Sequence, residues 1–216
     1  MATRNQKVQS YFHRSAADFD RLYNKNGYLS TIFNTLFRKA LYKRTDETIK
    51  ELKNSNCKSV LDVGCGTGVN AIQFIYNGCE TVTGVDYAEG MIALAKQQTP
   101  QEVTSKINYI AADFMNWECN KKFDAVVALG VFDYLDEPRK FLDKMYGFAQ
   151  KRVMFSVPGK GNLRQFVRKV RYNLRNCPLY FYSRNELSQL LEYPDCSFTL
   201  RGIGSSGFLC VIDKTK

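Results

Sequence analysis

From Lys58 to Val157, short apolar runs of strand type alternate with helical patterns, and this alternation restricts the fold more than any other feature. The strand-type runs read SVLDV, TVTGVD, NYIAAD, FDAVVAL and VMFSV. The helical patterns start near Val69 and continue in AEGMIALAKQQ and PRKFLDKMYGFAQ. Such alternation is typical of parallel strands joined by crossover helices. We therefore predict an α/β protein with a doubly wound, mostly parallel sheet that binds ligands at the carboxyl ends of its strands.

The segments on either side of this alternation are expected to form other elements. Residues 1–55 contain two helical patterns, at 8–23 and 33–41, and are expected to form an N-terminal helical lid region. Residues 56–216 are expected to form the core, with a basic helical insertion near 160–177.

The last third of the chain predicts one more helix and a hairpin. Ser183, followed three residues later by Glu186, reads as a capping box at the start of the helix SRNELSQLL. Ser197 to Leu200 and Phe208 to Ile212 read as two strands separated by RGIGSSG. We therefore expect a C-terminal antiparallel hairpin.

The composition favours one basic domain in a reducing compartment. The 216 residues are enough for one substantial core. Seven scattered cysteines include no Cys-x-x-Cys pair, which argues against a disulfide framework or a zinc site. No apolar stretch approaches the roughly 18 residues of a membrane span, and we expect a cytoplasmic location. The net charge of +10 favours an anionic partner, although a charge that only keeps the protein soluble explains it equally well.

The stretch LDVGCGTGVN, from Leu61 to Asn70, places three glycines at every second position after a strand. A dinucleotide fingerprint requires Gly-x-Gly-x-x-Gly, but position 69 is Val, and no Gly-Lys-Ser/Thr ending of a phosphate loop is present. The glycines instead predict a turn whose backbone a ligand approaches closely.

The pattern Asp62-x-Gly64-x-Gly66-x-Gly68 resembles that of the class I S-adenosylmethionine-dependent methyltransferases. The resemblance covers Ser59 to Val157, because further acids follow at the ends of the next two strands, Asp86 in TVTGVD and Asp113 in NYIAADF. It implies a Rossmann-like seven-stranded sheet and S-adenosyl-L-methionine as the cofactor. Taken singly, each of these acids would be an ordinary turn residue.

The resemblance also assigns roles to these residues. The glycine turn would admit the methionine half of the cofactor, and Asp86 would accept the two ribose hydroxyls. Asp62 would orient the loop and the cofactor's ammonium group, and Asp113 would bind the adenine amino group. The remaining residues implied for the cofactor site are Tyr87, Met91, Phe114 and Leu129.

The acceptor is harder to identify from sequence. After the fourth strand the chain reads ALGVF, which lacks the Asn/Asp-Pro-Pro-aromatic motif of many amino-group methylases, the Pro-Cys nucleophile of cytosine methylases and the carboxylates of metal-dependent catechol methylation. A metal-independent reaction on a small molecule remains. A general base is needed only for a protonated, weakly acidic acceptor. The candidates are His13, Asp133 and Tyr134, although His13 is also typical of a surface residue and Asp133 of a helix N-cap.

The segment YFHRSAADFDRLY resembles the N-terminal lid of many small-molecule methyltransferases. Tyr11 and Tyr23 are the aromatic residues expected to close over the cofactor. The same aromatic residues are equally typical of a helix packed on the core. A lid would exclude water and strengthen the contacts that position the substrate.

A basic helix is expected after the fifth strand, since no acid occurs between Lys151 and Arg184. It would suit an anionic membrane, an acidic substrate or RNA phosphates, or would simply present a solvated face. The segment also faintly resembles the C-terminal part of magnesium-protoporphyrin O-methyltransferases. The arginines that share one face of this helix are Arg164, Arg168, Arg171 and Arg175.

These observations favour a methyltransferase that acts on oxygen, or less often nitrogen, of a small anionic or amphipathic metabolite. An RNA methyltransferase that uses the basic helix, and a non-catalytic cofactor-binding regulator, are the alternatives. Peripheral association with an acidic membrane is a further expectation from the basic helix.

Overall fold

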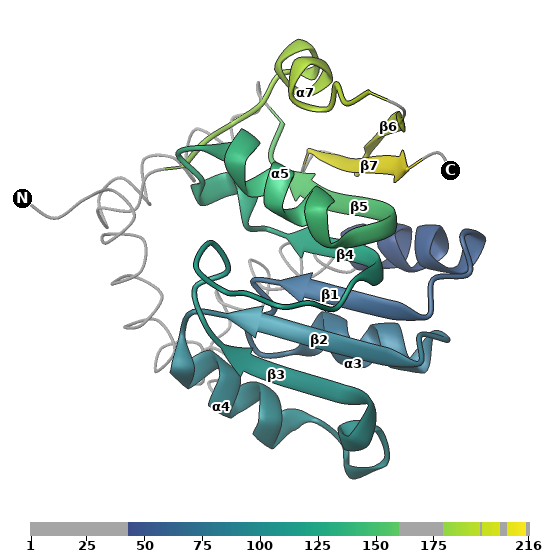
Figure 1. The fold of residues 1–216 in the computed structure, drawn as a ribbon, viewed down its shortest axis with the longest axis vertical. Coiled ribbons are helices and arrows are strands. Elements are labelled where there is room, and N and C mark those ends of the chain that lie inside the picture. Colours follow the sequence, from purple (N-terminus) through teal and green to yellow (C-terminus); the bar gives the residue numbers. More distant parts are fainter. Residues whose placement is uncertain (1–42, 160–178, 195, 204–206, 215–216) are drawn as a thin grey trace, which may run out of the picture.

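The computed structural model describes residues 43–159, 179–194, 196–203 and 207–214 (Figure 1). Most of the expected lid region and the whole expected basic insertion lie outside these residues. In the part of the chain that the structure describes, no helix is long and apolar enough to cross a membrane.

A seven-stranded sheet with the order β3-β2-β1-β4-β5-β7-β6 runs through the molecule (Figure 1). Strands β1 to β5 are parallel, and β7 runs antiparallel to both β5 and β6. The predicted doubly wound sheet and terminal hairpin are therefore confirmed. The strands are β1 (Ser59–Val63), β2 (Thr81–Asp86), β3 (Ile107–Ala111), β4 (Phe123–Leu129), β5 (Ala149–Val157), β6 (Cys196–Gly202) and β7 (Phe208–Lys214).

The helices after β1 agree with the predicted patterns apart from one boundary, whereas the helix at residues 43–54 lies beyond the predicted pattern at 33–41. The predicted helix PRKFLDKMYGFAQ ends at Phe148, because Ala149 is buried and pairs with Phe123 at the start of the strand ladder. Residues 43–54 are helical before β1. The other described helices are α3 (Val69–Tyr76), α4 (Glu89–Gln98), α5 (Pro138–Phe148) and α7 (Arg184–Leu190), with short 3₁₀ turns η1 (Gln101–Lys106) and η2 (Phe132–Tyr134).

The capping box at the start of α7 is also confirmed. The backbone N–H of Ser183 donates to Glu186 Oε2 over 2.7 Å, and the backbone N–H of Glu186 donates to Ser183 Oγ over 3.4 Å. The two residues satisfy donors that would otherwise lack partners at the helix start.

The hydrophobic core lies on both faces of the sheet. Val60 and Val127 contact the cluster that includes Phe74 on α3, whereas Leu61 and Val126 belong to the cluster on the α5 face. All four strand side chains are fully buried, as expected for central parallel strands covered by helices on each side. This frame fixes the positions of the strand ends.

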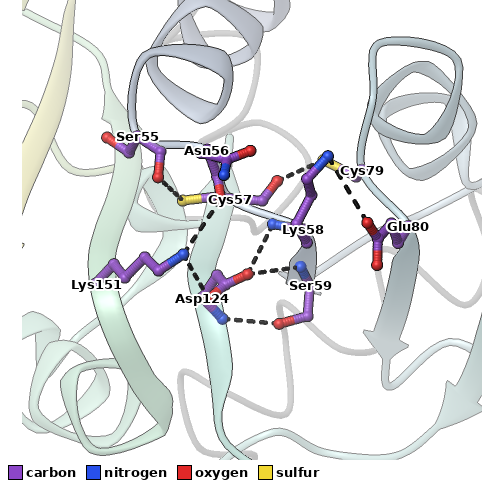
Figure 2. Close-up of polar contacts among 9 residues, drawn as sticks. All are labelled: Ser55, Asn56, Cys57, Lys58, Ser59, Cys79, Glu80, Asp124 and Lys151. Atoms are coloured by element: carbon purple, nitrogen blue, oxygen red, sulfur yellow. Dashed lines mark hydrogen bonds and ion pairs between the residues drawn. The ribbon is translucent and has the colours of Figure 1, made fainter.

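A polar network joins the amino ends of β1, β4 and β5 (Figure 2). Asp124 Oδ2 accepts the backbone N–H groups of Lys58 and Ser59 over 2.7 and 3.1 Å, and Lys151 Nζ lies 3.0 Å from Asp124 Oδ1. Ser59 Oγ in turn accepts the backbone N–H of Asp124 over 2.9 Å. These bonds hold the strands in register at the sheet edge opposite the glycine loop.

The order of the strands reverses between β1 and β4. From β1 the chain builds outward through β2 and β3, and it then returns to place β4 on the other side of β1. In doubly wound sheets the crevice beyond the carboxyl ends of such neighbouring strands is the usual ligand site. The glycine loop after β1 and the turn after β4 meet there.

Candidate cofactor and active site

The three loop glycines all have left-handed backbones, with φ of 69° at Gly64, 54° at Gly66 and 78° at Gly68. A Cβ at Gly64 would lie 2.4 Å from Val131 Cγ2, and one at Gly68 would lie 2.3 Å from Tyr109 Oη. A Cβ at Gly66 would meet no described atom within 4 Å. Packing inside the protein therefore requires two of the glycines, while Gly66 faces space that the described residues leave open.

Asp86, the last residue of β2, is hydrogen-bonded to the glycine loop. Its Oδ2 accepts the backbone N–H of Gly66 over 2.9 Å, and its Oδ1 accepts that of Ala88 over 2.9 Å. The half-buried Asp86 therefore connects the end of β2 to the glycine loop and helps to fix the shape of the loop.

Asp62, in β1, is a buried carboxyl group behind the loop. Its side chain is 1% exposed, and neither carboxyl oxygen has a hydrogen-bond partner among the described residues. Burial, with the charge of Asp86, raises the pKa of Asp62 to about 7, and the positive charge of Arg44 opposes this shift. A cationic or hydrogen-bond-donating group beside this buried carboxyl group would stabilise its ionised form.

Arg44, which no sequence pattern indicated, brings a positive charge to the site. It lies in the helix of residues 43–54, and its Nη1 would be 2.8 Å from a Cβ built on Gly130, whose φ is 81°. Gly130 follows β4, so the guanidinium group lies beside the carboxyl ends of the central strands. An arginine in a run of mixed charges gives no sequence signal of this placement, which depends on how the helix packs.

The same helix is fixed to the core by polar contacts on both sides. Thr45 Oγ1 donates to Asn70 Oδ1 over 2.9 Å, which connects the helix to the first turn of α3. The buried Glu51 pairs with Arg152 of β5 over 2.5 Å and with Arg201 of β6 over 2.6 Å. The position of Arg44 is therefore determined by long-range contacts.

Asp113 lies two residues beyond the end of β3, in a turn rather than in the strand itself. Its carboxylate accepts the backbone N–H of Met115 and the amide of Asn116, each over 3.0 Å. The turn fixes the direction of the carboxylate near the carboxyl end of the strand. The adenine role expected from the resemblance stays a prediction.

The apolar residues expected around the cofactor are mostly inside the core. Phe114 is 5% exposed, and the centre of its ring lies 4.9 Å from that of Phe141. Met91 and Leu129 are similarly buried, whereas Tyr87 is half-buried. Three of the four side chains are therefore packed inside the protein, and the roles of all four in cofactor binding stay predictions.

Asp133 and Tyr134 form η2 beyond β4. Asp133 is 4% exposed, and its backbone carbonyl accepts the N–H of Tyr180 over 2.8 Å. The alternative that Asp133 caps the next helix is wrong, because α5 begins at Pro138 with Glu137 as its N-cap residue. The buried acid lies close to Tyr182: burial raises the pKa of Tyr182, and the charge of Asp133 adds to this effect.

The described residues on each side of 160–178 come together at this turn. Tyr182 pairs with Gly159 in a parallel bridge, and its hydroxyl donates to the carbonyl of Phe132 over 3.2 Å. The described residues that flank 160–178 on both sides therefore lie beside η2.

Several predicted functional residues lie outside the described part of the chain, and their roles stay predictions. They are His13, the two lid tyrosines Tyr11 and Tyr23, and the four arginines of the basic segment. Within the described ranges, no group of three or more His, Cys, Asp or Glu side chains is arranged to hold a metal ion.

Solved structures of methyltransferases share this fold. A magnesium protoporphyrin IX methyltransferase from Synechocystis PCC 6803 with bound SAH superimposes with a TM-score of 0.77 at 19% identity, covering 99% of this chain and 100% of that chain. The methyltransferase domain of a bacterial Hen1 protein gives a TM-score of 0.66 at 22% identity over 82% of this chain and 100% of that chain. At these identities the likeness shows the fold alone.

Residues 60–151 match the family model described as "Methyltransferase domain". The matched segment is a methyltransferase domain.

Curated relatives of this methyltransferase domain are named ubiquinone biosynthesis O-methyltransferases. The mitochondrial ubiquinone biosynthesis O-methyltransferase of Dictyostelium discoideum is 33% identical over 95 residues, which cover 39% of this chain and 30% of the relative. The corresponding protein of Pseudomonas fluorescens strain Pf0-1 is 34% identical over 112 residues, or 50% of this chain and 48% of the relative. The match therefore spans less than half the length of these relatives.

The part of the methyltransferase domain that matches the family model contains the candidate residues from Asp62 to Tyr134. Arg44 precedes the matched segment, and Tyr180 and Tyr182 follow it.

Proposed function

We propose that this chain is an S-adenosylmethionine-dependent methyltransferase that transfers a methyl group to an oxygen of a small anionic or amphipathic molecule without a metal ion. The observation that carries the proposal is the open space in front of Gly66, bordered by Asp86 and backed by the buried Asp62. The match of residues 60–151 to the methyltransferase family supports it.

The described residues fit the cofactor group by group. The ammonium of the methionine end would supply the cationic partner that Asp62 lacks among the described residues, and Arg44 would attract the carboxylate. Asp86, at the end of β2, would accept the ribose hydroxyls. Asp113 would accept from the adenine amino group at the end of β3.

The bound cofactor supplies an activated methyl group on a sulfonium, so the protein's main task is to align the acceptor with it. In the proposal the acceptor lies beside η2 and the residues 179–182 that pack on it. A carboxylate acceptor would need no base. For an alcohol or phenol, Asp133 or Tyr134 would take the proton, and His13 is the further candidate from the sequence.

The names of relatives and neighbours support oxygen as the acceptor atom and an amphipathic substrate. They include ubiquinone biosynthesis O-methyltransferases and a magnesium protoporphyrin IX methyltransferase. In the proposal the basic segment of the sequence would attract an anionic group of the substrate through Arg164, Arg168, Arg171 and Arg175.

The deciding experiment is a metabolite-extract screen with cofactor that carries an isotope-labelled methyl group. Transfer of one labelled methyl to a small molecule, in the presence and absence of EDTA, would support the proposal and its metal independence. The Asp86→Ala protein is the inactive control. Cofactor binding by calorimetry without any labelled product from any extract would favour a non-catalytic role, and label in RNA alone would favour the RNA alternative.

The four arginines provide a second test of the anionic-substrate proposal. Changing all four to Gln should raise the substrate KM and leave cofactor affinity unchanged. Co-sedimentation with acidic and neutral liposomes, together with tRNA titrations at two salt concentrations, would identify a membrane or RNA surface instead. If the substrate KM, the liposome association and the tRNA affinity are all the same in the variant and in the wild type, the segment is a solvated face.

A further inference from the structure

A groove of about 450 Å³ lies on the sheet at β2 and β3, on the face that α4 leaves free. Tyr109 packs in the α4-side core, and its neighbours Asn108 and Ile110 point to the other face, because side chains alternate along a strand. Helices follow β1, β2 and β4, but the described connection from β3 to β4 contains none (Figure 1). The groove occupies the space that a crossover helix would cover.

The lining of the groove is apolar along the sheet and basic at one end. Ile110 and the half-buried Trp117 line the apolar part, and Thr83 adds a hydroxyl. Lys106 and Lys121 line it next to the first residues of β3 and β4, at the amino edge of the sheet. None of the described lining residues is Asp or Glu.

Among the described residues, no carboxylate pairs with Lys106 or Lys121, and both side chains are exposed. Lys121 Nζ lies 5.2 Å from the centre of the Phe123 ring, which holds its charge against the groove wall. Two unneutralised cations beside an apolar floor are complementary to a molecule with an acidic head and an apolar body.

The basic end of the groove is separate from the candidate cofactor site. Thr81 lines the groove and is the first residue of β2, whereas Asp86 is the last. At about 3.3 Å per residue, the two ends of this strand are roughly 16 Å apart. We propose that the groove is a second binding site, which takes a small amphipathic organic carboxylate with its acid group at Lys106 and Lys121 and its apolar body over Ile110 and Trp117.

Trp117 makes the site directly testable, because it is the only tryptophan in the chain. The full chain would be titrated with octanoate, and with neutral octanamide as the matched probe, while tryptophan fluorescence is followed. We expect a saturable change with octanoate, an affinity that weakens as salt rises, and binding of octanamide about tenfold weaker.

Variants of the groove residues test whether the fluorescence change comes from binding in the groove. The double change Lys106→Gln and Lys121→Gln should weaken octanoate binding about tenfold, whereas the exposed pair Lys96→Gln and Lys140→Gln should leave it unchanged. Asn108→Tyr, which fills the groove from an exposed position, should abolish the saturable signal. Cofactor affinity measured by calorimetry should be the same in all of these proteins.

Two results would overturn the proposal. The first is an absence of saturable octanoate binding, or equal binding by the wild-type and Lys106/Lys121 proteins. The second is complete displacement of octanoate by S-adenosylhomocysteine, which would place the probe in the cofactor crevice. Failure of the methylation screen would leave the fluorescence titration unaffected, so the two proposals fail independently.

Discussion

The carboxylate of Asp86 accepts the backbone N–H of Gly66 over 2.9 Å, although the two residues are 20 positions apart in the sequence. The bond joins the end of β2 to the middle of the glycine loop. The acid expected to bind the ribose and the loop expected to admit the methionine end are therefore one structural unit. A change at either residue should disturb both halves of the cofactor site.

Asp86→Ala should weaken S-adenosylmethionine binding by at least tenfold, since charge-assisted hydrogen bonds contribute about 1.5–3 kcal/mol. The fold should be retained because Asp86 is half-buried at a strand end. Calorimetry measures the affinity, and Glu89→Ala, three residues later and exposed on α4, is the matched control. Equal affinities of the two variants would show that the cofactor site has been misplaced.

Gly66→Ala should abolish cofactor binding, and Gly66→Val should do so more completely, because a side chain would enter the open space in front of the loop. Gly78→Ala is the control: Gly78 also has a positive φ, of 108°, and free space around a Cβ. Both alanine variants should lose similar stability, of order 1–2 kcal/mol, from backbone strain. Thermal unfolding and calorimetry separate strain from loss of binding. Normal binding by a folded Gly66→Val protein would contradict the loop assignment.

Asp62→Asn should change how stability depends on pH. The folded-state pKa of Asp62 is raised from 3.8 to about 7, so the unfolded chain ionises first and wild-type stability falls as pH rises between these values. As pH rises, the free energy of unfolding of the variant should increase relative to that of the wild type by up to about 1.4 kcal/mol per pH unit. This difference should level off above pH about 7. Urea unfolding from pH 4 to 8 measures this. A difference that stays constant over the range would exclude a raised pKa.

Glu51→Gln should destabilise the protein by about 3 kcal/mol, because the buried carboxylate pairs with Arg152 and Arg201 and its loss leaves cations beside a neutral group. Glu47→Gln on the same helix removes the pair with the exposed Lys50 and should change stability by less than about 1 kcal/mol. Chemical denaturation compares them. Similar losses in the two variants would mean that the buried network adds nothing beyond an ordinary surface pair.

The sequence contained enough local information for the sheet and for the strand-end acids. Apolar runs identified all the parallel strands, and the glycine spacing located the loop after β1, because these features depend on residues near one another in the chain. The position of Arg44 could not be predicted in this way, since it depends on Glu51 and Thr45 meeting partners far along the sequence. The pairing of Ala149 with Phe123, which places Ala149 in β5 rather than in α5, is another long-range effect.

The groove beside β3 was missed for a related reason. A connection without a helical pattern reads as an ordinary loop, and the sequence does not show which sheet face it leaves open. Only the pairing of β2 with β3 and the alternation along both strands bring Thr83 and Ile110 to the same surface.

The position of β7 sets the order in which this sheet can be assembled during synthesis. β7 lies between β5 and β6 but follows both in the sequence, and β6 has no other partner among the described strands. Until residues 208–214 have been made, β5 therefore keeps an unpaired edge that another chain could occupy. The five parallel strands that carry the glycine loop and the strand-end acids have all been synthesised by then. The nascent protein could therefore form most of the candidate cofactor site while the edge of β5 is still exposed to aggregation.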